Sequence, residues 1–458
     1  MAASDPSRLA AEVRRALRRS GACSARELCE TLGTSQPSVS RALIELRGQV
    51  LTFGRARATR YALRRAVPDV VAPISLYEVS RGPDQRPRHL ADLHPIEPSG
   101  FYVQARTDDV RSAVHDDLPW FLHDLRPQGY LGRMVAREHA ALGNPADVRL
   151  WTGDQVLRLL VRHGSDGVGA FIVGHEAYGA YVKQSLASPD GIPRSKRARR
   201  YADLAADAVR QGLPGSSAAG EQPKFLALRE DDDGIVPVLV KFSPPVDNPV
   251  AERIADLLIA EHVALQAITA AGHSAAASDL VFGGDRVFLE VERFDRDGPN
   301  HRIGQVALEA VDAEFVGHLT SWTDAVQGLL AQGLASPHDL TTTRWLARFG
   351  ELIANSDMHL GNLSFRLRGA TLAGLAPAYD MGPAAYAPLN GELRAPPFAP
   401  DLPDVTDADL AADVIEAATG AWRAVARHPR VSVGFKAIAS QNAAVVARLA
   451  EATRWLPG

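Results

Sequence analysis

Apolar residues recur every three or four positions in three short stretches at the start of the chain, which predicts three helices. The first spans residues 9–17 and is rich in arginine. The second begins after Ser24, which has a glutamate three positions on and so forms a capping-box pattern. The third begins within residues 35–38, and two alternating runs, 50–53 and 59–63, then predict a β-hairpin. Two helices joined by a short turn and followed by a hairpin predict a winged helix-turn-helix domain.

The charge of this segment supports that interpretation. Residues 1–65 contain 13 arginines and five acidic residues, a net charge of +8, so the remainder carries −12 within a chain of net charge −4. A basic segment of this kind is the part expected to meet a polyanion. Polar and basic positions of the third helix and of the hairpin turn are expected to contact operator DNA: Gln36, Ser38, Ser40, Arg41, Arg55 and Arg57. A helical interaction domain with a solvated basic face is the alternative.

The middle of the chain predicts a small α+β subdomain. Residues 66–73 are apolar but interrupted by proline, which is typical of a linker. Residues 74–79 and 101–104 have the alternating pattern of strands. A basic run at residues 194–200 indicates either a solvated face or contact with an anionic partner.

A further strand carries one lysine, Lys241, among apolar residues. A charge at such a position is costly to bury unless it is paired. The next helix offers Glu252 and Glu261 as partners, and an edge-strand lysine that reaches solvent is the alternative. Before this strand, residues 212–228 run from small residues through a basic residue into another alternating strand. The backbone N–H groups of such a loop can face phosphates.

The motif with the most chemical content lies near the C-terminal third: Asn355-Ser356-Asp357-Met358-His359-Leu360-Gly361-Asn362, followed by Asp380-Met381-Gly382. An Asp, an Asn five residues later and a second Asp before glycine are the groups that kinase-type phosphoryl transfer needs. One carboxylate receives or orients the proton of the substrate hydroxyl, and the Asn and second Asp are oxygen ligands for Mg²⁺ on nucleotide phosphates. His359 taken alone also fits a structural histidine.

The composition of the chain limits the classes of protein to which it can belong. The chain has 458 residues, 46 % hydrophobic and 23 % charged, which fits a soluble protein of about three domains. No apolar run approaches the roughly 20 residues of a membrane span, and the first 20 residues lack the apolar stretch of a signal peptide. Cys23 and Cys29 are too few for a disulfide framework. We therefore expect a cytoplasmic protein with no membrane partner.

Together these motifs resemble the HipA-type serine/threonine kinases, the toxins of type II toxin–antitoxin systems. The resemblance covers about residues 74–440 and rests on these positions: residues 217–224, Lys241, residues 292–296, residues 355–362 and residues 379–380. It implies an α+β, two-lobed protein-kinase-like fold that uses ATP and Mg²⁺, here preceded by the winged helix-turn-helix. The expected domains are the DNA-binding domain, a HipA-like N-terminal α+β subdomain, the kinase N-lobe and the helical C-lobe: residues 1–66, 74–200, 201–300 and 301–458.

The resemblance also implies roles for individual residues. Asp357 would be the catalytic base, and Asn362 and Asp380 would bind Mg²⁺. The residues implied to hold the nucleotide are Ala219, Gly220, Glu221, Gln222, Pro223, Lys224, Lys241, Glu261, Glu292, Arg293, Phe294, His359, Asn362, Tyr379 and Asp380. Ser217, or its neighbour Ser216, matches the autophosphorylated serine. The chain departs from the family at Glu221, where a small residue is usual, and at Gly361, where Lys or Arg is frequent, which leaves ATP affinity open.

The function implied is phosphorylation of a translation-related protein, of the aminoacyl-tRNA synthetase class, with inhibition by autophosphorylation and with DNA-binding autoregulation. A transcription regulator whose kinase fold senses a ligand without phosphorylating protein is the alternative. A small-molecule kinase is a third reading, against which the serine-bearing loop argues. Whether the chain forms a homodimer or has a separate antitoxin stays open.

Overall fold

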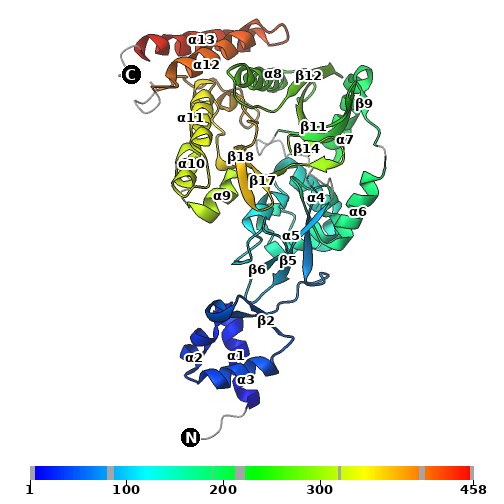
Figure 1. Cartoon of the computed structure of the whole chain (residues 1–458). Helices are drawn as coiled ribbons and strands as arrows, with labels where there is room; N and C mark the ends of the chain where they lie inside the picture. The colour runs from blue at the N-terminus through cyan, green and yellow to red at the C-terminus, as the bar shows by residue number, and fades with distance from the viewer. Residues whose placement is uncertain are drawn as a thin grey trace.

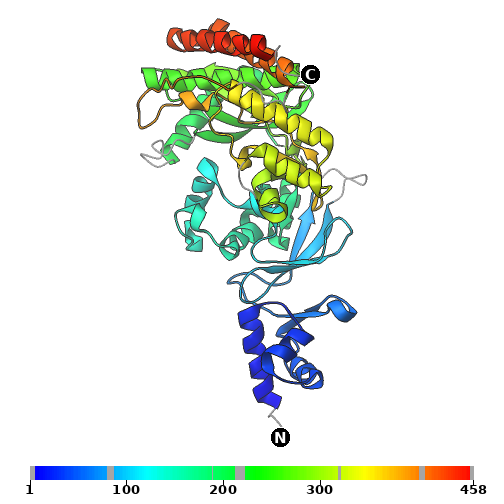
Figure 2. The same ribbon diagram turned by 90° about the vertical axis from the view of Figure 1, so that its left-hand side faces the viewer.

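The computed structural model describes residues 6–79, 87–187, 189–211, 222–317, 321–401 and 408–453. Its fold is mixed α+β. Figure 1 shows a small N-terminal part at one end, a middle part built on an antiparallel sheet, and an upper part with a second sheet and most of the longer helices. The view in Figure 2 shows the same sequence of parts along the molecule.

The N-terminal part packs around its own small core of buried apolar residues. Its elements are α1 (Pro6–Ser20), β1 (Cys23–Ser24), α2 (Ala25–Leu32), α3 (Gln36–Glu45), β2 (Val50–Phe53) and β3 (Arg60–Leu63). The backbone N–H of Ser24 donates to the Glu27 carboxylate at 2.6 Å, and that of Glu27 donates to the Ser24 hydroxyl, so the predicted capping box is present. Gly33, at φ 61°, ends α2. The three predicted helices and the hairpin are confirmed as elements, and the strands pair in the order β1-β3-β2.

The middle part is a five-stranded antiparallel sheet in the order β7-β6-β5-β4-β8, and two of its three helices, α5 and α6, pack against it. The elements are β4 (Ile74–Glu78), β5 (Arg88–Pro95), β6 (Phe101–Ala105), β7 (Ala113–His115), α4 (Gly129–Glu138), α5 (Gly153–His163), β8 (Phe171–Val173) and α6 (His175–Ser185). Both predicted strands are therefore present. The stretch at 66–73, expected as a linker, has no helix or strand, yet Val67 is buried in the main core.

The N-terminal part is joined to the middle sheet by more than the connecting chain. The backbone N–H of Glu97 donates to the Leu63 carbonyl at 2.9 Å. The rings of Phe53, on β2, and Tyr102, on β6, stack with centroids 4.1 Å apart. Backbone pairing and ring stacking therefore hold the two parts in one arrangement.

A second five-stranded sheet, β12-β13-β11-β10-β9, has α7 on one face and α8 on the other. These elements are β9 (Ile192–Pro193), α7 (Arg197–Gln211), β10 (Lys224–Asp231), β11 (Gly234–Phe242), α8 (Pro249–Ala270), β12 (Ser278–Gly283) and β13 (Arg286–Glu292). The expected boundary between residues 200 and 201 falls inside α7. Tyr201 on that helix is fully buried against Phe225 and Phe288 of the sheet, so α7 belongs with the strands that follow it.

The rest of the chain is mainly helical. It contains two small sheets, β14-β15 and β16-β17-β18, and the long helices α11 to α13. The elements are β14 (Arg296–Asp297), β15 (His301–Arg302), β16 (Gly304–Ala307), α9 (Leu308–Phe315), α10 (Trp322–Ala331), α11 (Pro337–Leu352), β17 (Ser364–Arg368), β18 (Thr371–Leu375), α12 (Ala411–Arg427) and α13 (Val433–Thr453). Figure 2 shows α8 lying alongside α12 and α13. Among the described residues, no helix is both long and apolar enough to cross a bilayer.

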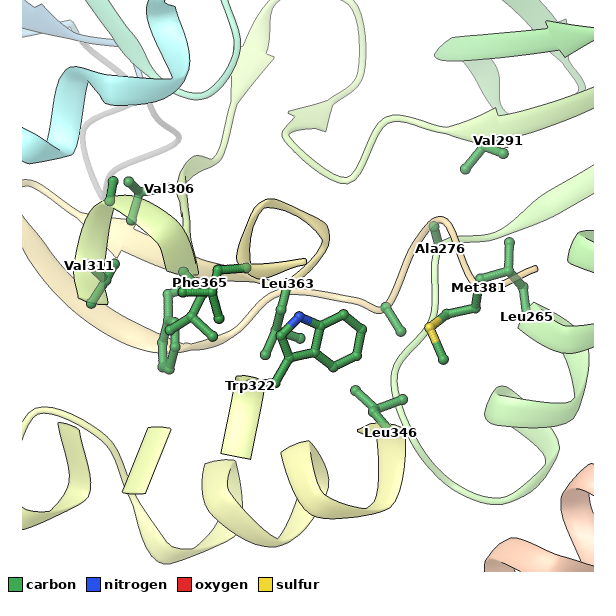
Figure 3. Packing of buried hydrophobic residues seen from close by; sticks show 14 of the residues in the cluster. Leu265, Ala276, Val291, Val306, Val311, Trp322, Leu346, Leu363, Phe365 and Met381 are labelled. Atoms are coloured by element: carbon green, nitrogen blue, oxygen red, sulfur yellow. The ribbon is translucent and has the colours of Figure 1, made fainter. Parts of the chain in front are cut away.

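The core of this upper part extends to both segments of the Asp–Asn–Asp motif. Figure 3 shows Leu363 beside the Trp322 indole, and Met381 close to Ala276 and Leu265. Leu363 and Met381 are each only 1 % exposed. Because each directly follows a motif residue in sequence, the core fixes the backbone from which the polar side chains project.

Candidate functional site

Lys241 lies on β11 at the centre of a buried charge cluster. Its ammonium Nζ lies 2.6 and 2.9 Å from the two carboxylate oxygens of Glu261, on α8, and 2.6 Å from Oδ1 of Asp380. Lys241 is 6 % exposed, so the edge-strand alternative is wrong. Of the two helix glutamates, Glu252 is exposed in the first turn of α8, whereas Glu261 is buried against the lysine. The structure thus brings together a strand, a helix and the Asp-x-Gly turn.

The three charges shift one another's ionisation. Burial opposes the charged form of Lys241, but Asp380 and Glu261 outweigh it and raise its pKa. Burial likewise opposes ionisation of Asp380, yet Lys241 and then Lys224 hold the pKa of that carboxyl below its usual value. For Glu261 burial prevails, and its pKa is raised despite Lys241. Two carboxylates therefore compete for one buried cation, a strained arrangement typical of functional sites.

The backbone around Asp380 is tightly constrained. Asp380 has φ 54°, in the left-handed region that non-glycine residues seldom adopt. A Cβ atom on Gly382 would lie 3.3 Å from the Cβ of Glu261, so the turn passes close to α8. Ala354, just before the other half of the motif, also has a positive φ of 58°. Such strain persists where surrounding contacts enforce it, which is common at active sites.

The loop after α11 holds Asp357 by side-chain bonds to its backbone. The Asn355 side-chain oxygen accepts the N–H of Asp357 at 3.0 Å, and the Asn362 amide donates to the Asp357 carbonyl at 2.7 Å. Both asparagines are buried, whereas the Asp357 carboxylate is 68 % exposed. The His359 Nε2 lies 4.0 Å from that carboxylate, and its Nδ1 accepts the N–H of Gly361. The loop therefore presents one exposed carboxylate from a fixed backbone.

Two further residues hold the loop. The Tyr379 hydroxyl donates to the Gly361 carbonyl at 2.6 Å and lies 2.8 Å from the Ser364 hydroxyl. Burial raises the pKa of Tyr379, so the phenol stays protonated as a donor. The indole N–H of Trp322 donates to the His359 carbonyl at 2.8 Å. Sequence reasoning missed Trp322 and Ser364, since neither belongs to a local pattern.

Residues 292–294, implied by the resemblance to hold the nucleotide, begin at the last residue of β13. The N–H of Arg293 donates to the Pro237 carbonyl at 3.0 Å, and its guanidinium pairs with Asp295. Glu292 accepts a bond from Arg229 at 2.6 Å, so its carboxylate is already engaged. The Phe294 ring lies 5.4 Å from that of Tyr379, which places an aromatic pair beside the charge cluster.

The expected phosphate loop is described only at its end. Five residues expected in or beside this loop lie outside the described part of the chain: Ser216, Ser217, Ala219, Gly220 and Glu221. Gln222 donates from its side-chain amide to the Phe242 carbonyl at 2.6 Å, and the Pro223 carbonyl accepts the N–H of Phe242. Lys224 pairs in register with Lys241 on the adjacent strand. The loop residues nearest to β10 are thus anchored beside the cluster.

The residues expected to contact DNA lie on the N-terminal part, far along the chain from this cluster. Gln36, Ser40 and Arg41 are exposed on α3, and Arg55 and Arg57 are exposed in the hairpin turn. The Ser38 hydroxyl is half-buried and lies 3.0 Å from that of Ser35.

The donor set suits Mg²⁺ and a nucleotide. No cluster of three or more His, Cys, Asp or Glu ligands occurs in the described part of the chain. Mg²⁺ bound to a nucleotide needs only one or two carboxylates, because phosphate oxygens and water complete its shell. Asp380 and Asn362 can supply such oxygens. Asp380 is about a third exposed, with Oδ1 held by Lys241.

Comparison with known proteins identifies the family. Residues 216–452 match the HipA-like C-terminal domain, and residues 70–182 match the YjjJ-like toxin, middle domain. Toxin YjjJ of Escherichia coli (strain K12) is 40 % identical over 427 residues, which cover 92 % of this chain and 94 % of that protein. The chain belongs to the HipA-like toxins.

Solved structures related to this HipA-like toxin are more distant. One is the Shewanella oneidensis MR-1 toxin–antitoxin system of HipA, HipB and its operator DNA, with 16 % identity and a TM-score of 0.49 over 83 % of this chain and 97 % of that one. Another is the Helicobacter pylori proinflammatory kinase CtkA, with 14 % identity and a TM-score of 0.36 over 50 % of this chain and 94 % of that one.

Proposed function

We propose that this HipA-like toxin is an ATP- and Mg²⁺-dependent serine/threonine protein kinase. The observation that carries the proposal is the cluster in which Lys241 contacts both Glu261 and Asp380 beside the loop that holds Asp357. A lysine fixed by a helix glutamate and an aspartate at a strained turn is the arrangement that positions nucleotide phosphates in kinases.

Each residue then has a defined task. Bound Mg²⁺ would neutralise charge on the phosphates, with Asp380 and Asn362 as its protein ligands. Lys241 places its ammonium against the phosphate oxygens. Asp357 accepts the proton of the substrate hydroxyl as that oxygen bonds to the γ-phosphorus, the bond to the β-phosphate oxygen breaks, and ADP leaves. The exposed Asp357 carboxylate is accessible to a protein substrate, as this step requires.

Lys241 already contacts Asp380 Oδ1, so Oδ2 is the carboxylate oxygen left open to a metal. The same contact favours a second candidate function, a DNA-binding regulator whose kinase fold binds a ligand without transferring phosphate. In that case the Lys241–Asp380 pair is the resting state of a sensor. The two candidates differ in whether phosphate is transferred.

The test is incubation of the purified chain with γ-labelled ATP and Mg²⁺, alone and with a bacterial extract. We expect label on the chain at Ser216 or Ser217 and on a translation-related protein, an aminoacyl-tRNA synthetase being the expected class. Asp357→Asn should abolish labelling. Glu416→Gln, which changes an exposed acid on α12, is the matched control and should label normally. ATP binding without labelling of wild type would favour the regulator.

We also propose that the N-terminal part is a winged helix-turn-helix that binds operator DNA. Three helices, a hairpin and the exposed residues of α3 support it. Binding to the promoter of its own gene should weaken steeply with salt, and Arg41→Gln should weaken it further. Glu45→Gln, at an exposed acid near the end of α3, should not weaken it. Equal binding by wild type and Arg41→Gln across a salt series would contradict this assignment.

A further inference from the structure

A cleft of about 570 Å³ lies between the N-terminal part and the middle sheet. One wall comes from the end of α1, the segment after it and the hairpin of β2 and β3. The other comes from the turn between β5 and β6 and from the region of β7. Cavities of roughly 300–1,000 Å³ at such junctions are the usual size and place for small-molecule sites. This cleft is remote from the Lys241 cluster in sequence and belongs to neither proposed function.

The walls are held at a fixed separation. The stacked Phe53 and Tyr102 rings, one from each wall, both line the cleft. Gly21, at φ 72°, lies next to the other wall, since a Cβ atom there would make van der Waals contact with the Pro98 ring at 3.6 Å. The backbone bond from Glu97, which lines the cleft, to Leu63 of β3 also ties the two parts together. Each wall therefore contributes one aromatic ring to the cleft.

Of the charged residues that line the cleft, two are already engaged with neighbouring groups and two are not. Arg60 donates to the Ala22 carbonyl at 2.6 Å, and Glu97 lies 3.7 Å from Arg18, so these two are engaged. Arg19, from the N-terminal wall, and Asp116, from the middle wall, also line the cleft and are exposed. Neither has a hydrogen-bond or ion-pair partner among the residues that the structure describes.

We infer that this cleft binds a small aromatic zwitterion, a compound with one ring, one carboxylate and one ammonium group. Arg19 pairs with the carboxylate, since a guanidinium fork matches that group. Asp116 pairs with the ammonium, and the ring lies against Phe53 and Tyr102. Because the two charges belong to different walls, the ligand bridges the N-terminal part and the middle sheet.

The experiment uses isothermal titration of the full chain with three probes: L-tryptophan, tryptamine, which lacks the carboxylate, and indole-3-propionate, which lacks the ammonium. Wild type should bind tryptophan at least tenfold more tightly than either half-probe. Arg19→Gln should weaken tryptophan binding about tenfold or more and remove its advantage over tryptamine. Asp116→Asn should likewise weaken tryptophan binding about tenfold or more and remove its advantage over indole-3-propionate.

Arg15→Gln on α1 and Asp108→Asn in the middle part change exposed charges outside the cleft lining and serve as matched controls. Both should bind like wild type. Far-ultraviolet circular dichroism of every variant checks that the fold is retained, which the exposure of all four residues favours. The inference is overturned if wild type binds none of the probes at millimolar concentration. It is equally overturned if Arg19→Gln and Asp116→Asn bind tryptophan as wild type does.

Discussion

Replacing Lys241 by methionine tests the buried charge cluster directly. Methionine matches the length of the lysine stem but brings no charge, so Glu261 and Asp380 would face each other without a cation. The lysine side chain is 7 % exposed and that of Glu261 is 10 %, so solvent replaces little of the lost attraction. Asp380, at 36 %, is partly screened and contributes less.

The expected loss of stability in this part of the fold is about 3 kcal/mol at neutral pH, the lower end of the ~3–5 kcal/mol that follows removal of one partner from a buried pair. The loss should also depend on pH. The pKa of Glu261 is already raised by burial, and removing Lys241 raises it further. A raised pKa means that stability is greatest below the unfolded pKa and is lost as the pH rises towards the folded one. The Lys241→Met penalty should therefore shrink by about 1–3 kcal/mol between pH 7.5 and pH 5.5.

Hydrogen-exchange protection factors of the β11 and α8 amides, measured for wild type and variant at both pH values, give this local stability. The double variant Lys241→Met/Glu261→Gln is the matched control, because it removes the buried carboxylate and should recover most of the loss. A penalty below 1 kcal/mol, or one that is the same at both pH values, would refute the reasoning.

Three more predictions concern single contacts. Tyr379→Phe keeps the ring but loses the hydrogen bond to the Gly361 carbonyl. It should lower the phosphotransfer kcat about tenfold with little change in KM for ATP. An unchanged kcat would show that the hydroxyl does not position the loop. Trp322→Phe loses the indole bond to the same loop and should cost about 1–2 kcal/mol by urea unfolding, and no change would argue against that bond. Phe53→Ala removes the stack on Tyr102 and should increase cleavage between the first two parts in limited proteolysis, whereas wild-type resistance would mean that backbone pairing alone holds them.

Local patterns were enough to predict the elements that local interactions stabilise. The capping box at Ser24 and the strands at 74–79 and 101–104 are present because capping groups and alternating faces act within a few residues. Lys241 on its strand and Asp380 at its turn were also predicted from the sequence as candidate functional residues. The contact between Lys241 and Asp380 depends on the tertiary fold, because 139 residues separate them in the sequence.

Other features depend on packing that a single sequence does not encode locally. Spacing left Glu252 and Glu261 as alternatives, because choosing between them requires the rotation of α8 against the sheet. Burial also differs between residues of the basic run at 194–200. Arg197 is buried and paired with Glu290, whereas most of its neighbours are exposed. The Trp322 bond to the loop that holds Asp357 comes from a helix without any recognisable motif.

The rate of γ-phosphate transfer from Mg²⁺-ATP, measured for wild type and Asp357→Asn side by side at equal nucleotide occupancy, tests the central claim most directly. We expect transfer by wild type and a rate at least a thousandfold lower in the variant, since the exposed carboxylate proposed to take the proton is lost while the Lys241 cluster remains. Equal rates in the two proteins, or no transfer by wild type with ATP bound, would contradict it.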